Sequence, residues 1–267
     1  MLTWLLPFCR MKDAGLKTKA KPGRGPLSKP QRALLALDGR SVEVQLRLNP
    51  RARRLIVKVH PSTGEVAVVA PSRAALTRAL DFARGESAWI ARQLSSVPSR
   101  ISLNVGARVP FRGEEHVIRA SDAQGEGPVW LEKGYDVPVI RVAGRSEHIP
   151  RRLTDFLKRQ AREALEIRAF DYTARIGVKH SRITVRDTAS RWGSCSSARS
   201  LSFSWRLILA PPFVLDYVVA HEVAHIREMN HGRNFWKLVA QLVGDPRPAQ
   251  KWLRDHGMAL HRYASKA

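Results

Sequence analysis

His221-Glu222-Val223-Ala224-His225 places two imidazoles four residues apart, with a carboxylate directly after the first. On an α-helix this spacing puts both histidines on one face, one turn apart, where they can hold a single metal ion. Zinc suits such ligands, because it binds neutral imidazole and keeps one position open for water in a catalytic site. Glu222 would lie beside the open position and take a proton from that water. The motif therefore predicts a catalytic zinc site.

The residues around the motif predict that it lies on a buried helix. Val214, Val218 and the run from Ala220 to Ala224 supply apolar periodicity, and neither Pro nor Gly occurs from Phe213 to Asn230. Pro211-Pro212 ends the preceding segment. We therefore expect a helix that begins after the prolines and carries both histidines toward the interior.

The third metal ligand is expected to be His231. It lies six residues after His225, so a continued helix would point it away from the metal. A sharp turn is therefore required, and Asn230 and Gly232 tolerate the left-handed backbone of helix ends. The alternatives that the spacing leaves open are Glu228, Asp245, Asp255, His256 and His261.

The composition bounds the class of protein. With 267 residues, 44% of them hydrophobic, the chain can bury a substantial core in one large domain or two small ones. Cys9 and Cys195 are its only cysteines, which excludes a cysteine-built zinc finger and argues against a disulfide framework. This cysteine usage fits a reducing compartment, and we expect a cytoplasmic protein.

The formal net charge of +23 predicts attraction to polyanions. Residues 1–30 carry seven Lys or Arg against Asp13 alone, and residues 1–31 are expected to form a basic, disordered tail. Besides a polypeptide substrate, we therefore expect nucleic acid as a partner, bound through this tail and a basic surface. Solvated faces without any partner are the competing interpretation. The apolar run in Met1 to Cys9 is too short to span a membrane, so no transmembrane segment is expected.

Alternating apolar residues predict a strand-rich first half. The expected strands cover residues 41–48, 55–59, 65–70, 108–111, 116–119, 129–131 and 137–142, with a helix from Ser72 to about Leu94. A helix over 153–172, strands at 183–185 and 201–209, the metal helix and helices at 235–243 and 248–253 follow. This segregation predicts an α+β fold. The expected division is the tail 1–31, a β-rich N-terminal subdomain 32–148 and a compact helix-and-sheet catalytic subdomain 149–267.

A longer motif surrounds the histidine pair. It comprises Arg191-Trp192-Gly193-Ser194-Cys195-Ser196, Pro211-Pro212, Asp216-Tyr217-Val218-Val219, the histidine motif, Asn230-His231 and Phe235-Trp236. In these residues the chain resembles the YgjP-like metallopeptidases, compact zincins related to the WLM and SprT-like peptidases, and the likeness covers roughly residues 32–262. The resemblance implies a zincin-like catalytic domain and proteolysis, with zinc held by His221, His225 and His231 and with Glu222 as the catalytic base.

A zinc hydrolase also needs a group that stabilises the tetrahedral oxyanion, and the candidates by chemistry are Arg191, Tyr217 and His256. The alternative function is a nucleic-acid-binding protein in which the zinc site is structural or inactive. A structural site would be closed by a fourth protein ligand, with His256 or His261 as the candidates. Glu222 has no role in that alternative, so the hydrolase is the preferred hypothesis.

Overall fold

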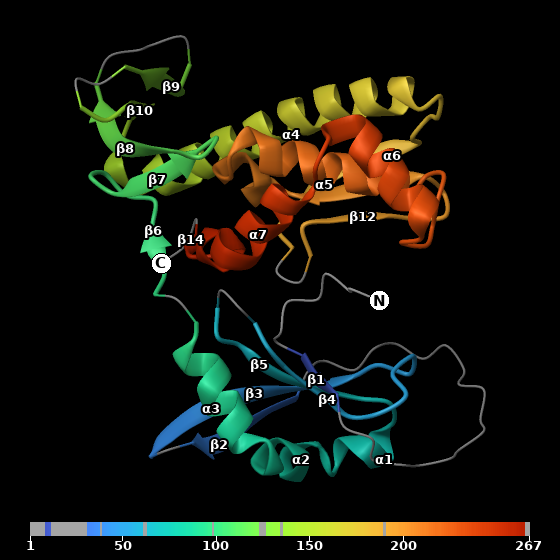
Figure 1. Cartoon of the computed structure of the whole chain (residues 1–267). Coiled ribbons are helices and arrows are strands. Elements are labelled where there is room, and N and C mark those ends of the chain that lie inside the picture. The colour runs from blue at the N-terminus through green and yellow to red at the C-terminus, as the bar shows by residue number, and fades with distance from the viewer. Residues whose placement is uncertain are drawn as a thin grey trace. The chain divides into compact units, whose positions relative to one another are not determined.

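The computed structural model describes residues 9–11, 31–37, 39–60, 63–97, 99–122, 127–133, 136–188 and 191–264 (Figure 1), with the backbone alone for 9–11 and 264. The chain divides into two compact units, here the N-terminal unit within residues 5–98 and the C-terminal unit within residues 99–267. Each unit has its own hydrophobic core. Strand-rich sheets precede most of the helices, so the α+β prediction is confirmed.

The N-terminal unit is a five-stranded sheet with three short helices on one face. Its strands lie in the order β1-β4-β5-β3-β2. Their bounds are Cys9–Met11 (β1), Gln31–Leu37 (β2), Arg40–Leu48 (β3), Ile56–Val59 (β4) and Val66–Ala70 (β5). Alternate strand residues such as Leu35, Val44 and Val57 are buried, as a half-buried sheet requires. Ile90 closes this core from the helix side.

The helical part of this unit differs from the sequence prediction. One helix was expected from Ser72, but the chain forms α1 (Arg73–Leu76), α2 (Ala79–Gly85) and α3 (Ser87–Ser95). Ser72 caps the first helix as expected, since its Oγ accepts the N–H of Ala75 at 3.2 Å. Gly85 ends α2, in keeping with its poor helix propensity. Strand β2 was not expected at all; it includes Gln31, which the sequence assigned to the tail.

The C-terminal unit contains a four-stranded sheet, a three-stranded sheet and four helices (Figure 1). The larger sheet has the order β7-β8-β10-β9, from Arg108–Phe111 (β7), Glu114–Ser121 (β8), Val129–Glu132 (β9) and Val139–Ala143 (β10). The smaller sheet has the order β11-β13-β12, from Arg182–Arg186 (β11), Gly193–Cys195 (β12) and Ser200–Ser204 (β13). Ile101–Ser102 (β6) pairs with Tyr263–Ala264 (β14). The helices are Ile149–Arg175 (α4), Pro212–Ala224 (α5), Arg233–Val243 (α6) and Arg247–Leu260 (α7).

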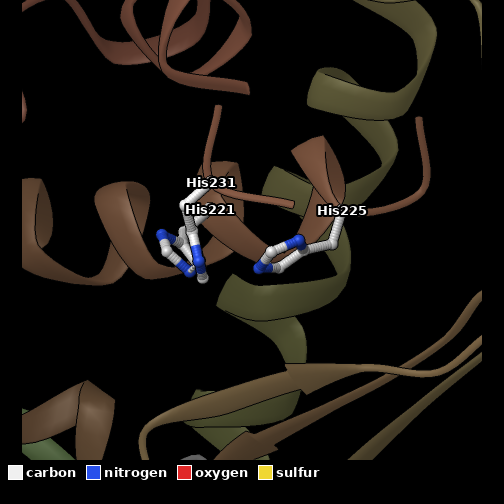
Figure 2. A group of neighbouring side chains, drawn as sticks. All are labelled: His221, His225 and His231. Atoms are coloured by element: carbon white, nitrogen blue, oxygen red, sulfur yellow. Dashed lines mark hydrogen bonds between the residues drawn. The ribbon is translucent and has the colours of Figure 1, made fainter. Parts of the chain in front are cut away.

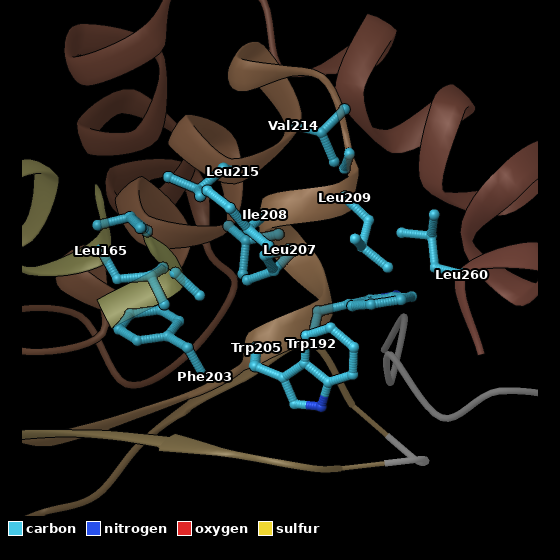
Figure 3. Close-up of a cluster of buried hydrophobic side chains, with 14 of the residues drawn as sticks. Leu165, Trp192, Phe203, Trp205, Leu207, Ile208, Leu209, Val214, Leu215 and Leu260 are labelled. Atoms are coloured by element: carbon cyan, nitrogen blue, oxygen red, sulfur yellow. The ribbon is translucent and has the colours of Figure 1, made fainter. Parts of the chain in front are cut away.

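A single core joins the four-stranded and three-stranded sheets of this unit to its helices. Figure 3 shows the part of this core between α4, the smaller sheet and α5. Ile140 of the larger sheet, Leu157 of α4 and Phe203 of the smaller sheet are all buried in it. The sequence-based division lies between residues 148 and 149, whereas the boundary between the compact units lies between residues 98 and 99 of the sequence. The composition does change where α4 begins, but the larger sheet packs against that helix and belongs to the same unit.

Helix α5 is buried on all sides. Ten of its thirteen residues are buried, and α4, α6, α7 and β12 pack around it. A helix that is apolar around its whole circumference belongs in such an interior position. Pro212 stands in its first turn, where the missing N–H costs nothing. Residues 205–209, which precede α5 in the sequence, form a 3-10 helix with five buried residues. They were expected to be part of a strand. None of the described helices is long and apolar enough to cross a membrane.

Candidate metal centre

The three histidines come from the end of α5 and the turn that follows it. Helix α5 ends at Ala224, so His221 lies in its last turn and His225 is the residue that directly follows the helix. We expected a sharp turn at Asn230 and Gly232. The bond from the N–H of Gly232 to Asn230 O at 2.8 Å marks that turn, and the chain also tightens earlier, directly after α5. The N–H of Ile226 is bonded to Val223 O at 3.0 Å and the N–H of Arg227 to Ala224 O at 3.1 Å. This tightening redirects the chain, so that it brings His231 back to the other two histidines.

The imidazoles of His221, His225 and His231 converge (Figure 2). One ring nitrogen from each lies within 4.8 Å of the others, and this group of three could hold a metal ion. The Nε2 atoms of His221 and His231 are 3.1 Å apart. Two nitrogens at zinc-bond distance on a tetrahedron are separated by about 3.3 Å, because zinc–nitrogen bonds measure about 2.0 Å. The spacing of these donors therefore matches a common ligand sphere.

The surroundings of the rings favour the neutral, metal-binding form of histidine. Burial and the neighbouring imidazoles lower the pKa of His221 to about 3. Desolvation also lowers the pKa of His225 and of His231. The Nδ1 of His225 lies 3.1 Å from the carbonyl oxygen of Glu228. Donation of a proton from this Nδ1 to that carbonyl leaves Nε2 as the ligand atom.

Aromatic side chains of α6 pack against the three imidazoles. The Phe235 ring is completely buried, and its centroid lies 4.9 Å from that of His221, 4.6 Å from His225 and 4.7 Å from His231. The Trp236 ring stacks on His231 at 6.0 Å. Phe235 therefore restricts the orientation of all three rings at once, a role that its position in the sequence does not reveal.

Glu222 directly follows His221 on α5 and packs against Gly193 of strand β12. Its side chain is buried, and the backbone N–H of Cys195 donates a hydrogen bond to its carboxylate. Gly193 leaves room for it: a Cβ at position 193 would come within 2.6 Å of Glu222 Cγ and 2.7 Å of Oε1. Burial raises the pKa of Glu222 to about 8, while the positive charge of Arg191 and the Cys195 bond act in the opposite direction.

The candidate oxyanion groups lie in different surroundings. Tyr217 is buried and lines a cavity of about 20 Å³ together with Trp192, Gly193, Val218, His221 and Glu222, and its hydroxyl accepts a hydrogen bond from Gln250 Nε2 at 3.1 Å. Arg191 is exposed, and its charge reaches Glu222. His256 is exposed on α7, contacts Trp252 in a tilted arrangement with ring centroids 5.2 Å apart, and is not among the residues that line this cavity.

The role of strand β12 could not be predicted from the sequence. The Cys195 side chain packs against the core, where burial raises the pKa of its thiol to about 11. The group that contacts Glu222, however, is the Cys195 backbone, and Gly193 contributes by lacking a side chain. Asp216 pairs with Arg168 of α4 at 2.8 Å and so ties α5 to α4. Only the glycine inside the motif hinted at such a close approach.

Three convergent imidazoles with a buried carboxylate beside the first are the arrangement of a mononuclear metallopeptidase site. The family model of the YgjP-like metallopeptidase domain matches residues 53–256, and the chain belongs to this family. Among solved structures, the chain is similar to the metallopeptidase zymogen of Pyrococcus abyssi abylysin, with 15% identity and a TM-score of 0.31. That likeness covers 35% of this chain and 92% of the other. None of the curated proteins matches the chain.

Proposed function

We propose that the protein is a zinc-dependent peptidase in which Glu222 is the general base. The observation that carries the proposal is the placement of one buried carboxylate next to three convergent imidazoles. A glutamate that served only structure would be paired with a cation or exposed to water, because an isolated buried carboxylate is unfavourable. Here it is held by a backbone N–H and faces the cavity beside His221.

The donor set fits zinc. It offers three neutral nitrogen ligands, which is the number found in catalytic zinc sites with one open position. A structural zinc site would require a fourth protein ligand. Within the part of the chain that the structure describes, the convergent group consists of His221, His225 and His231. His261, considered as a fourth ligand, instead packs against Trp192 in a tilted arrangement with ring centroids 5.1 Å apart.

When bound, the zinc ion would supply Lewis acidity and make a water molecule acidic near neutral pH. The residues of the chain supply the remaining steps. Glu222 accepts the proton of the attacking water and delivers it to the leaving amine. Because Cys195 N–H and Gly193 fix the carboxylate, Glu222 needs little reorientation between these two transfers.

Strand β12 offers backbone groups to which the backbone of the substrate can hydrogen-bond. It is an edge strand, and its partner β13 bonds with Trp192 O and Ser196 N on one side. Backbone groups alternate in direction along a strand, so those of Gly193 and Cys195 face the free edge. Glu222 accepts the Cys195 N–H, which leaves the Gly193 groups and the Cys195 carbonyl for a substrate. An extended peptide can add to such an edge through main-chain hydrogen bonds, which accept many side-chain sequences. Tyr217, which lines the adjoining cavity, is the proposed oxyanion donor.

Metal content and casein cleavage, measured on the same preparations, test this proposal. We expect one zinc per chain, cleavage of unfolded casein, and loss of cleavage in Glu222→Gln with zinc still bound. His225→Ala is the matched control, since it should lose the metal as well as the activity. Unchanged cleavage by Glu222→Gln would refute the mechanism. Zinc at one per chain without cleavage, with or without DNA, would favour the nucleic-acid-binding alternative.

A further inference from the structure

The β11-β13-β12 sheet has two chemically different faces. Ile183, Val185, Leu201 and Phe203 pack into the core on the side of α4 and α5, and Gly193 shares that side because it is paired with Phe203. The other face carries only hydroxyls and guanidinium groups. Its residues are Arg182, Thr184 and Arg186 of β11, Ser200, Ser202 and Ser204 of β13, and Ser194 of β12. Ser204 is buried, and the other six residues are called the polar face below.

The register of the strands makes the polar face continuous. Thr184 is paired with Ser202, and Ser202 is paired with Ser194, so three hydroxyl side chains form one row across the sheet. Arg182 and Arg186 flank this row on the outer strand β11, four residues apart, a spacing of about 13 Å along an extended chain. The face therefore presents short hydrogen-bonding groups between two long cationic ones.

Further cations border the polar face. The N–H of Ser181 donates to the carbonyl oxygen of Arg199 at 3.0 Å, so Arg199 lies beside the start of β11. Lys179 shortly precedes β11 in the sequence. Lys179, Arg182, Arg186 and Arg199 are all exposed. In the described ranges no carboxylate lies within ion-pair distance of these four side chains. Residues 179–206 hold six Lys or Arg against Asp187 alone, and Asp187 is paired with the buried Arg206.

We propose that the polar face binds the phosphate backbone of nucleic acid without reading its bases. Arg, Lys, Ser and Thr side chains are the usual partners of phosphate oxygens, and such contacts fix the position of a strand without sequence selection. Protein–nucleic acid interfaces are polar and strongly positive. The net charge of +23 adds a long-range attraction of the same sign.

The composition of this face favours nucleic acid over an acidic protein. Protein interfaces depend on a few buried aromatic or aliphatic anchors, and the polar face offers none. It also lies across the sheet from Glu222, since Gly193 and Cys195 of β12 turn to the other side. Nucleic acid bound here would leave the metal centre open. This inference is therefore independent of the proposed peptidase activity.

The test compares two variants of the full chain that lose the same charge. Arg182→Gln/Arg186→Gln alters the polar face. Arg151→Gln/Lys158→Gln removes two exposed cations from α4 that likewise have no ion-pair partner among the described residues. Fluorescence anisotropy of a labelled single-stranded DNA of mixed sequence, over a series of salt concentrations, gives the affinity and its salt dependence. Circular dichroism checks that both variants are folded, as the exposure of all four side chains leads us to expect.

We expect the polar-face variant to bind about tenfold more weakly or worse. Its slope of log affinity against log salt should fall by about 1.4, because each lost phosphate contact removes about 0.7 for a single strand. The α4 variant should stay within about threefold of the unaltered protein. Equal losses in both variants would overturn the proposal, because they would show an effect of total charge alone. Binding of polyglutamate as tightly as DNA would overturn it as well.

Discussion

Gly193 and Glu222 form the tightest side-chain-to-backbone packing of the candidate site. Burial raises the pKa of the Glu222 carboxyl to about 8 despite the opposing charge of Arg191, so its ionised form is disfavoured at neutral pH. A divalent cation on the three imidazoles would favour the ionised form again. The base would therefore gain its charge when the site gains its metal, and the same carboxylate must be kept in place in both states.

The first prediction concerns this contact. Gly193→Ala should lower kcat/KM for casein about 100-fold, because a methyl group within 2.6 Å of Glu222 Cγ must displace the carboxylate, and small misplacements of catalytic groups have effects of about this size. Zinc content should stay unchanged, since the histidines are not touched. Gly85→Ala, where a Cβ meets nothing within 4 Å, is the control and should keep full activity. Normal activity of Gly193→Ala would contradict the positioning role of this glycine.

At the scale of elements, the sequence revealed the metal helix and concealed the strand beside it. Helix α5 could be predicted because apolar periodicity, two prolines and the histidine spacing agree over thirteen residues. Strand β12 has three residues, with Gly and Ser among them, and acts through its backbone, so no side-chain pattern marks it. His231 was predicted from its chemistry, and the structure places it beside the other two histidines. The earlier turn at His225 was not, because hydrogen bonds between i and i+3 leave no sequence signature there.

Helix α6 contributes to the site without supplying a ligand. Phe235→Leu should weaken zinc affinity about tenfold, because the three imidazoles lose the ring that restricts them, and supporting groups around metal ligands have effects of about this size. Competition with a fluorescent zinc chelator measures the affinity. Phe156→Leu removes a comparable ring from the same core, where Phe156 contacts Phe111, and should leave zinc affinity unchanged. Equal weakening in both variants would mean that general core packing, not the contact of Phe235 with the three histidines, sets the zinc affinity.

On the scale of the whole molecule, the two cores are separate clusters. Leu35, Val44 and Ile90 belong to the N-terminal core, whereas α4, α5 and the metal centre belong to the C-terminal core. Every candidate metal ligand and Glu222 lie in the C-terminal unit. The N-terminal unit is thus stabilised by its own contacts, independently of the metal. The C-terminal unit is stabilised by its own contacts together with the metal.

Metal removal should therefore destabilise one unit only. Free zinc at about 1,000 times its Kd stabilises the folded state by about 4 kcal/mol. Because about 1 kcal/mol shifts Tm by 2–4 °C in a unit of this size, a chelator should lower the melting of the C-terminal unit by roughly 10 °C. Hydrogen exchange followed by mass spectrometry resolves the units: exchange should rise in α5 and α6 and stay constant in β3 and β5. The same chelator, saturated with zinc beforehand, is the control and should change neither unit. A chelator effect of equal size in β3 and β5 would show that the two units unfold as one.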